Sequence, residues 1–255
     1  MSAPQVWVGT SWKMNKLRTQ ARAFAQTLAA APVIGDARIQ PFVIPPFTSI
    51  AEVAGLLAAT RVKVGAQNAH WAEAGAWTGE VSLPMIKDAG ATLVELGHSE
   101  RRTHFGETDA TVALKTAAAL ALGVTPLICV GDTRAEFDAG QTHAVLERQV
   151  TAALSQIAPE HRSEVILIAY EPVWSIGEGG TPAEPGFVNA QHACTKTLAH
   201  SLLGHSVPVL YGGSVNQDNA APLIAQPNVD GLFVGRAAWN VEGYVDILSR
   251  VAGAL

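Results

Sequence analysis

Several features that define common protein classes are scarce in this sequence. The 255 residues include only two cysteines, Cys129 and Cys194, and no CxxC pair, so neither a disulfide framework nor a structural zinc site is expected. No apolar run reaches the roughly 18 to 20 residues of a membrane span. The first 7 residues lack the basic region and apolar stretch of a secretory signal, so we expect a protein of the reducing cytoplasm.

Positive charge is also scarce. The chain has 17 Lys and Arg against 22 Asp and Glu, a formal net charge of −5 and a pI near 5.9. Such a surface does not attract nucleic acid or an anionic membrane as a whole, so we expect neither as a partner. An anionic ligand would therefore need local hydrogen-bond donors.

The remaining composition favours one large folded core. Hydrophobic residues make up 48% of the chain and charged residues 15%, which is too apolar for disorder. No Pro/Ser-rich linker and no block of charge marks a boundary. We therefore expect a single domain over residues 1–255.

Short runs rich in Val, Ile and Leu recur between longer helical stretches, a pattern typical of parallel strands buried on both faces. We predict strands at 6–9, 39–44, 62–66, 92–96, 125–130, 165–170, 207–211 and 231–234. The clearest helical segments are 17–31, 108–122, 135–157, 187–203 and 241–251. Eight β-then-α units in about 250 residues predict an α/β protein with a (β/α)8 TIM barrel. An open doubly wound sheet is the alternative, but GxGxxG and GxxxxGK[ST] are both missing.

Local signals mark several helix ends. Ser49-x-x-Glu52 and Thr133-x-x-Glu136 have the capping-box pattern, which predicts helix starts at both places. Gly123, followed three residues later by a proline, predicts a helix end before the next strand.

Polar residues follow the predicted strands, at the end where barrel active sites form. Lys13 follows the first strand, His98 the fourth and Glu171 the sixth. Glycine-bearing turns follow the sixth, seventh and eighth strands, and they contain Gly177, Ser214 and Gly235-Arg236. The sequence therefore brings a lysine, a histidine and a carboxylate to one face, beside turns rich in backbone donors.

These residue types suit proton transfer on a phosphorylated substrate. Glu171, at the mouth of an apolar strand, is partly desolvated and therefore basic enough to take a proton from carbon. His98 can polarise a carbonyl, and Lys13 can stabilise an enediolate. Backbone N–H groups near Ser214 and Gly235 can bind phosphate.

Each residue also has an ordinary structural explanation. A glutamate after a strand is often a cap, and a single histidine or lysine is often a structural or solvated group. Arg101-Arg102 can be explained as an ion-pair cluster. His98-x-Glu100, with His104 and Glu107 nearby, superficially resembles a zinc site, but PCxxC and HExxH are absent, so we expect no metal.

Longer motifs occur in order along nearly the whole chain. They are SerTrpLysMetAsn at 11–15, GlyAlaGlnAsn at 65–68, ThrGlyGluValSer at 78–82, LeuGlyHisSerGluArgArg at 96–102, TyrGluProValTrpSerIleGly at 170–177 and TyrGlyGlySerVal at 211–215. In these motifs the chain resembles the triosephosphate isomerase family.

The resemblance implies roles for the polar residues. Glu171 would be the general base, and His98 the neutral electrophile, as in triosephosphate isomerase itself. Lys13 would stabilise negative charge, and Glu100 would support both through polar contacts. Residues 172–181 would form a lid over the substrate. Phosphate would bind backbone N–H groups near four residues, Gly177, Ser214, Gly235 and Arg236.

The resemblance also has implications for partners and assembly. Members of the family bind a small phosphorylated sugar, need no cofactor or metal and are usually homodimers. The third loop, residues 68–82, would make the dimer contact, with Thr78 at its tip reaching the partner's active site.

Some positions depart from the family pattern. Ser11 replaces an asparagine that lines the end of the pocket away from phosphate, Gly235-Arg236 replaces two glycines, Glu178 stands where threonine is common, and His70-Trp71 is unusual. These departures resemble the L-erythrulose-1-phosphate isomerase subgroup of tetritol breakdown, which forms D-erythrulose 4-phosphate. Its substrate has one extra hydroxymethyl group distal to phosphate, where the shorter Ser11 leaves room.

Two alternatives remain. In a glycolytic triosephosphate isomerase, which converts dihydroxyacetone phosphate to glyceraldehyde 3-phosphate, the loss of one hydrogen bond at Ser11, worth about 1 kcal/mol, would be tolerated. A barrel that only binds a phosphorylated metabolite would have no need of a carbanion base.

Overall fold

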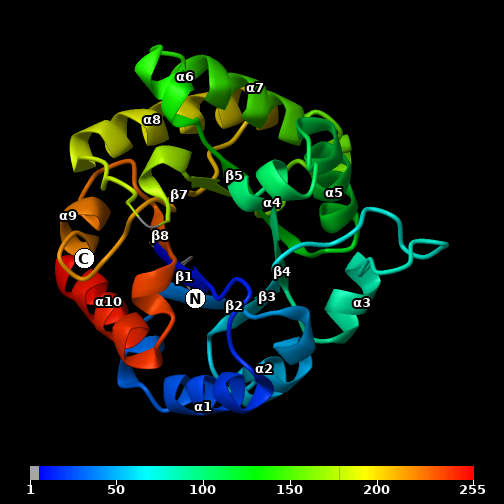
Figure 1. Cartoon of the computed structure of the whole chain (residues 1–255), viewed down its shortest axis with the longest axis vertical. Coiled ribbons are helices and arrows are strands. Elements are labelled where there is room, and N and C mark those ends of the chain that lie inside the picture. The colour runs from blue at the N-terminus through cyan, green and yellow to red at the C-terminus, as the bar shows by residue number, and fades with distance from the viewer. Residues whose placement is uncertain (1–5, 178) are drawn as a thin grey trace.

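The computed structural model describes residues 6–177 and 179–255, and in it eight parallel strands close into a barrel ringed by helices (Figure 1). Each strand pairs with the next in chain order, and β8 pairs with β1. The strands are β1 (Val6–Ser11), β2 (Ile39–Ile44), β3 (Lys63–Ala66), β4 (Leu93–Leu96), β5 (Thr125–Val130), β6 (Leu167–Tyr170), β7 (Val209–Tyr211) and β8 (Gly231–Val234). The predicted (β/α)8 barrel is confirmed.

Helices connect successive strands and pack on the outside of the barrel. They are α1 (Arg18–Ala29), α2 (Ile50–Leu57), α3 (Leu83–Asp88), α4 (Ser99–His104), α5 (Asp109–Ala121), α6 (Arg134–Asp138), α7 (Thr142–Leu154), α8 (Pro185–Leu203), α9 (Ala220–Ile224) and α10 (Val241–Ala254). Short 3₁₀ segments occur at Pro32–Gly35, Phe47–Ser49, Pro159–His161, Val173–Ser175 and Arg236–Ala238. Across the described part of the chain, none of the helices combines the length and the apolar character that crossing a bilayer requires.

Alternation along the strands separates two apolar layers. One set of strand residues points outward and packs against the helices in a large shared core. The other set fills the barrel and consists of Trp7, Phe42, Ile44, Leu93, Leu127, Cys129, Leu167, Ala169, Leu210 and Phe233. Because these apolar side chains fill most of the interior, most of the polar groups that line the cavity lie at the strand ends.

Two sequence predictions about helix ends are confirmed. Thr133 caps α6, since its side chain accepts a hydrogen bond from the Glu136 N–H while the Glu136 carboxylate accepts one from the Thr133 N–H. Gly123, with a φ of 66°, directly follows the cap residue of α5. Its left-handed conformation stops the helix, as the glycine signal predicted.

The helix start predicted at Ser49 is also confirmed, since Ser49 is the N-cap residue of α2, but its capping box does not form. The side chain of Ser49 makes no capping hydrogen bond, and Glu52 accepts hydrogen bonds from Arg18 and Arg22 of α1. One helix prediction is wrong. The single helix expected over 135–157 is divided into α6 and α7 at Gly140, whose φ of 70° is left-handed. A helix cannot continue through a residue in that conformation.

Candidate active site

The strand ends bring the predicted catalytic residues together around a cavity of about 320 Å³. Lys13, His98 and Glu171 line it, and Ser11 lies beside them. The predicted phosphate-binding residues line the same cavity, and these are Gly177, Ser214, Gly235 and Arg236. Residues from β1, β4, β6, β7 and β8 thus share one site.

Glu171 follows β6 and is 4% exposed. Its Oε2 is buried and has no hydrogen-bond partner among the described residues. Gly212 makes room for this side chain, since a Cβ there would lie 2.7 Å from Glu171 Cγ. Burial, together with the nearby carboxyl of Glu95, raises the pKa of Glu171 to about 8. The result is a desolvated, basic carboxylate facing the cavity.

His98 is held as a neutral hydrogen-bond donor. It caps α4, and its Nδ1 accepts a hydrogen bond of 3.1 Å from the Glu100 N–H. Because Nδ1 accepts, the proton of the neutral ring lies on Nε2, which is 3.7 Å from Glu171 Oε2. Burial, together with the charge of Lys13, lowers the pKa of His98 to about 4. At neutral pH the imidazole therefore presents an N–H to the cavity.

Lys13 adopts an uncommon backbone conformation, with a φ of 53°. The carbonyl oxygen of Lys13 accepts a hydrogen bond of 2.9 Å from Gln67 Nε2, which holds the loop after β1. The ammonium lies 2.6 Å from Glu100 Oε1, so Glu100 contacts Lys13 through its side chain and His98 through its backbone. Left-handed non-glycine residues of this kind concentrate at functional sites.

The opposite side of the cavity carries the turns predicted to bind phosphate. Gly177 has a left-handed φ of 86° and lies in the predicted lid. The Ser214 N–H donates to Ser175 Oγ at 3.1 Å, which links the β7 turn to the start of the lid. Arg236 opens the 3₁₀ segment after Gly235, and its position on the cavity wall is compatible with phosphate binding. Glu178, the lid residue that departs from the family pattern, lies outside the described residues.

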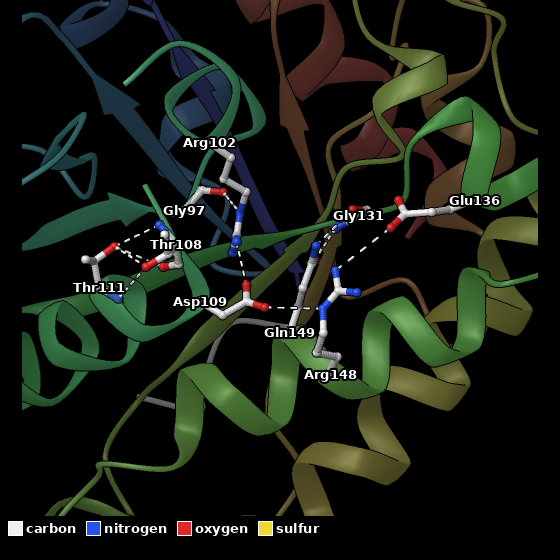
Figure 2. Close-up of polar contacts among 9 residues, drawn as sticks. All are labelled: Gly97, Arg102, Thr108, Asp109, Thr111, Gly131, Glu136, Arg148 and Gln149. Carbon is white, nitrogen blue, oxygen red and sulfur yellow. Dashed lines mark hydrogen bonds and ion pairs between the residues drawn. The ribbon is translucent and has the colours of Figure 1, made fainter. Parts of the chain in front are cut away.

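Figure 2 shows a network of hydrogen bonds and ion pairs that begins at Gly97, the residue before His98. Arg102 donates to the Gly97 carbonyl at 2.8 Å and pairs with Asp109 of α5 at 2.5 Å. Asp109 also pairs with Arg148 of α7 at 3.3 Å. Arg101 pairs with Glu107, so the interpretation of Arg101-Arg102 as an ion-pair cluster is confirmed, and Arg102 holds the turn that precedes His98.

Gln149 of α7 supports the Glu171 side in the same way (Figure 2). Its amide accepts a hydrogen bond from the Gly131 N–H at 2.8 Å and donates one to the Gly131 carbonyl at 3.2 Å. Gly131 lies against the backbone of Glu171, since a Cβ there would be 2.0 Å from the Glu171 carbonyl oxygen. Side chains of α4 and α7 thus hold the backbone next to both His98 and Glu171.

Sequence analysis missed Glu95, an inward-facing carboxyl on β4. It is 3% exposed and accepts a hydrogen bond of 2.7 Å from Ser11 Oγ. Burial raises the pKa of Glu95 to about 7, while the Ser11 hydrogen bond opposes the rise. A charged residue at an inward position of a strand whose neighbours are all apolar was the available signal. Ser11 lines the site as expected, but its hydroxyl is already engaged.

Glu107, a member of the superficial zinc-like cluster noted in the sequence, takes part in ion pairs. Glu107 pairs with Arg101 at 3.1 Å and with the buried Lys115 at 2.5 Å. Within residues 6–177 and 179–255, no three His, Cys, Asp or Glu side chains are grouped so that they could hold a metal ion.

The predicted dimer loop projects from the barrel between β3 and α3 (Figure 1). Its residues 73–80 are exposed, Thr78 among them. His70 stacks on Trp71 and packs at a tilt against Trp77, with ring centroids 4.1 and 4.4 Å away. The unusual His70-Trp71 pair thus belongs to an aromatic cluster within the loop.

Comparison with known proteins agrees with this geometry. The family model described as triosephosphate isomerase matches residues 6–251. A protein of Mesorhizobium japonicum named L-erythrulose-1-phosphate isomerase is 59% identical over 98% of both chains. Proteins of the same name from Rhizobium rhizogenes and Brucella abortus are 54% and 55% identical, covering 100% and 96% of this chain and 97% and 96% of their own. The chain therefore belongs to the triosephosphate isomerase family.

Proposed function

We propose that this chain interconverts L-erythrulose 1-phosphate and D-erythrulose 4-phosphate through an enediolate. The observation that carries the proposal is the pairing of a basic, desolvated Glu171 with a neutral His98 Nε2 only 3.7 Å away, on the wall of one cavity. The names of the relatives from Mesorhizobium and Brucella support the choice of substrate.

The reaction moves one proton between neighbouring carbons. Glu171 takes the proton from C3 of L-erythrulose 1-phosphate, and the electrons shift onto the carbonyl oxygen at C2. The Nε2–H of His98 and the ammonium of Lys13 stabilise that oxygen. His98 moves the hydroxyl proton from the C3 oxygen to the C2 oxygen, and Glu171 returns its proton to C2. A ketone and a hydroxyl have then exchanged places without net redox change, so the step requires no cofactor.

The cavity has room for the two ends of this substrate. The phosphate would lie at Gly177, Ser214, Gly235 and Arg236, and the reacting carbons between His98 and Glu171. The terminal hydroxymethyl group would then lie toward Ser11. This end of the site adjoins a second cavity of about 210 Å³, which Ser11 also lines.

The deciding experiment is a comparison of kcat/KM for L-erythrulose 1-phosphate and dihydroxyacetone phosphate. We expect the tetrulose phosphate to be preferred tenfold or more, roughly 1.4 kcal/mol of discrimination between transition states. A preference for dihydroxyacetone phosphate would indicate a glycolytic triosephosphate isomerase. Absence of solvent proton exchange into either compound would indicate a barrel that binds without catalysis.

We further propose a cytoplasmic homodimer that acts in erythritol breakdown. Neither Cys129 nor Cys194 forms a disulfide, which suits a reducing compartment. Large apolar side chains lie exposed on the loops after β1 and β3 and at the end of α4, where a second subunit would cover Met14, Trp77 and Phe105.

A further inference from the structure

Two cavities meet at one wall of the site. Both are lined by Ser11, Lys13 and His98, but only the larger one reaches the turns expected to bind phosphate. The smaller one is lined by Glu95 and Glu100 instead. The wall formed by Ser11 and Glu95 therefore lies at the end of the site away from phosphate.

Glu95 is chemically out of place in the barrel interior. The inward-facing residue before it on β4 is Leu93, and the layer below consists of apolar side chains. Burial there removes the hydration of a carboxylate, which is costly unless the group is paired. Among the described residues, its only hydrogen-bond donor is Ser11, and no ion pair holds it. A buried carboxyl with so little compensation indicates a role beyond packing.

The hydrogen bond to Glu95 determines what Ser11 offers to a ligand. A serine hydroxyl has one proton, and at 2.7 Å from Glu95 Oε2 that proton points away from the substrate. Ser11 Oγ then faces the cavity as an acceptor only. The donors of the site, Lys13 and His98, lie on the reacting side.

We propose that Glu95 is a specificity-determining residue, which orients Ser11 so that the distal end of the site accepts a hydrogen bond from the terminal hydroxymethyl group of the substrate. This inference rests on the proposed function. A tetrulose phosphate carries a hydroxyl donor beyond the carbon that loses its proton. Dihydroxyacetone phosphate has no carbon there, so its turnover depends less on Glu95.

The test is a set of variants assayed on both compounds, with the ratio of the two kcat/KM values as the readout. Glu95→Leu should lower the preference for L-erythrulose 1-phosphate by about tenfold, mainly through KM. Any effect on the basicity of Glu171 acts on both substrates and cancels in the ratio. Ser11→Ala should give the same loss, and the double variant should lose no more than either single variant, because the pair acts as a unit.

Two controls separate this role from a structural one. Glu95→Gln keeps an oxygen that accepts from Ser11 and should retain most of the preference. Leu93→Val alters packing on the same inward face of β4 and should leave the ratio unchanged. A Glu95→Leu enzyme that loses activity equally on both compounds, or keeps its preference, overturns this inference alone. A wild-type enzyme that prefers dihydroxyacetone phosphate overturns the proposed function and this inference together.

Discussion

Glu171 shows how a single side chain obtains its reactivity from its surroundings. Its carboxyl is removed from water by burial and is made more basic by a second buried carboxyl, Glu95. Lys13 and Cys129 act in the opposite direction and favour its ionised form. The base is therefore balanced between groups that raise its pKa and groups that lower it.

The length of this side chain is as important as its pKa. Glu171→Asp withdraws the carboxylate by about one C–C bond, so the base no longer reaches the substrate carbon, and we expect kcat to fall by at least about 100-fold. Substrate affinity should change little, because the proposed phosphate-binding turns lie apart from Glu171 on the cavity wall. Steady-state kinetics on both substrates measure the effect, and near-normal turnover would remove Glu171 from its role as base.

The pKa directions also predict a pH profile. Glu171 must be ionised to act, and its pKa is raised to about 8, so kcat/KM should rise with pH through that region. His98, with a pKa lowered to about 4, stays neutral throughout and contributes no limb there. Glu95→Gln removes a charge that raises the pKa of Glu171, so the acidic limb should move to lower pH. An unchanged limb, or one shifted upward, would contradict this. Among the described residues, the titratable or charged groups near Glu171 include Lys13, Glu95, His98, Glu100, Arg102 and Cys129.

At the scale of helices and strands, the hydrophobic pattern predicted where the strands lie, whereas the sequence did not predict which side chains pair with one another. Every strand was located, although β6 and β7 begin at Leu167 and Val209, two residues after the predicted starts at 165 and 207. Val165 is 52% exposed and lies outside the barrel, which apolar character alone does not reveal. The burial of a strand depends on the apolar character of its own residues, so the positions of the strands could be predicted from local sequence.

Contacts between distant segments could not be predicted in this way. Glu52 matches a capping box, but its actual partners, Arg18 and Arg22, come from a different helix. Glu95 and Ser11 are 84 residues apart and meet only because the barrel closes. The shared location of the proposed catalytic residues Lys13, His98 and Glu171 could be predicted because they follow strands and match long motifs, whereas Glu95 belongs to no such motif.

The break between α6 and α7 predicts opposite effects for two glycine substitutions. Gly140→Ala places a side chain at a φ of 70° and should lower the free energy of unfolding by about 1 kcal/mol. Gly55→Ala, in the exposed middle of α2, meets no atom within 4 Å and should raise it by up to about 1 kcal/mol. Denaturant unfolding measures both, and kcat should stay unchanged in each. Equal effects of the two substitutions would show that backbone strain at Gly140 is not the cause.

For the whole molecule, the exposed loops predict assembly. Met14 and Phe105 are 97% and 69% exposed and border the second cavity, which a partner's loop would cover. Sedimentation should give twice the chain mass of 26.7 kDa. Thr78→Arg should shift the protein toward monomer and lower kcat/KM by at least tenfold, because the partner's loop no longer completes the site. A fully active monomeric variant would show that catalysis does not depend on assembly and would contradict this prediction.

The aromatic cluster in this loop has a practical consequence. Trp77 is 50% exposed and packs at a tilt against His70. Indole emission shifts to shorter wavelength when the ring leaves water, so subunit association should be visible in the intrinsic fluorescence of the unlabelled protein. Trp77→Phe keeps an aromatic ring beside His70 but removes the indole. The difference in emission between the wild-type protein and this variant therefore isolates the fluorescence of Trp77 from that of the other tryptophans. The loop that would join two subunits thus contains a natural fluorophore whose emission should report their association.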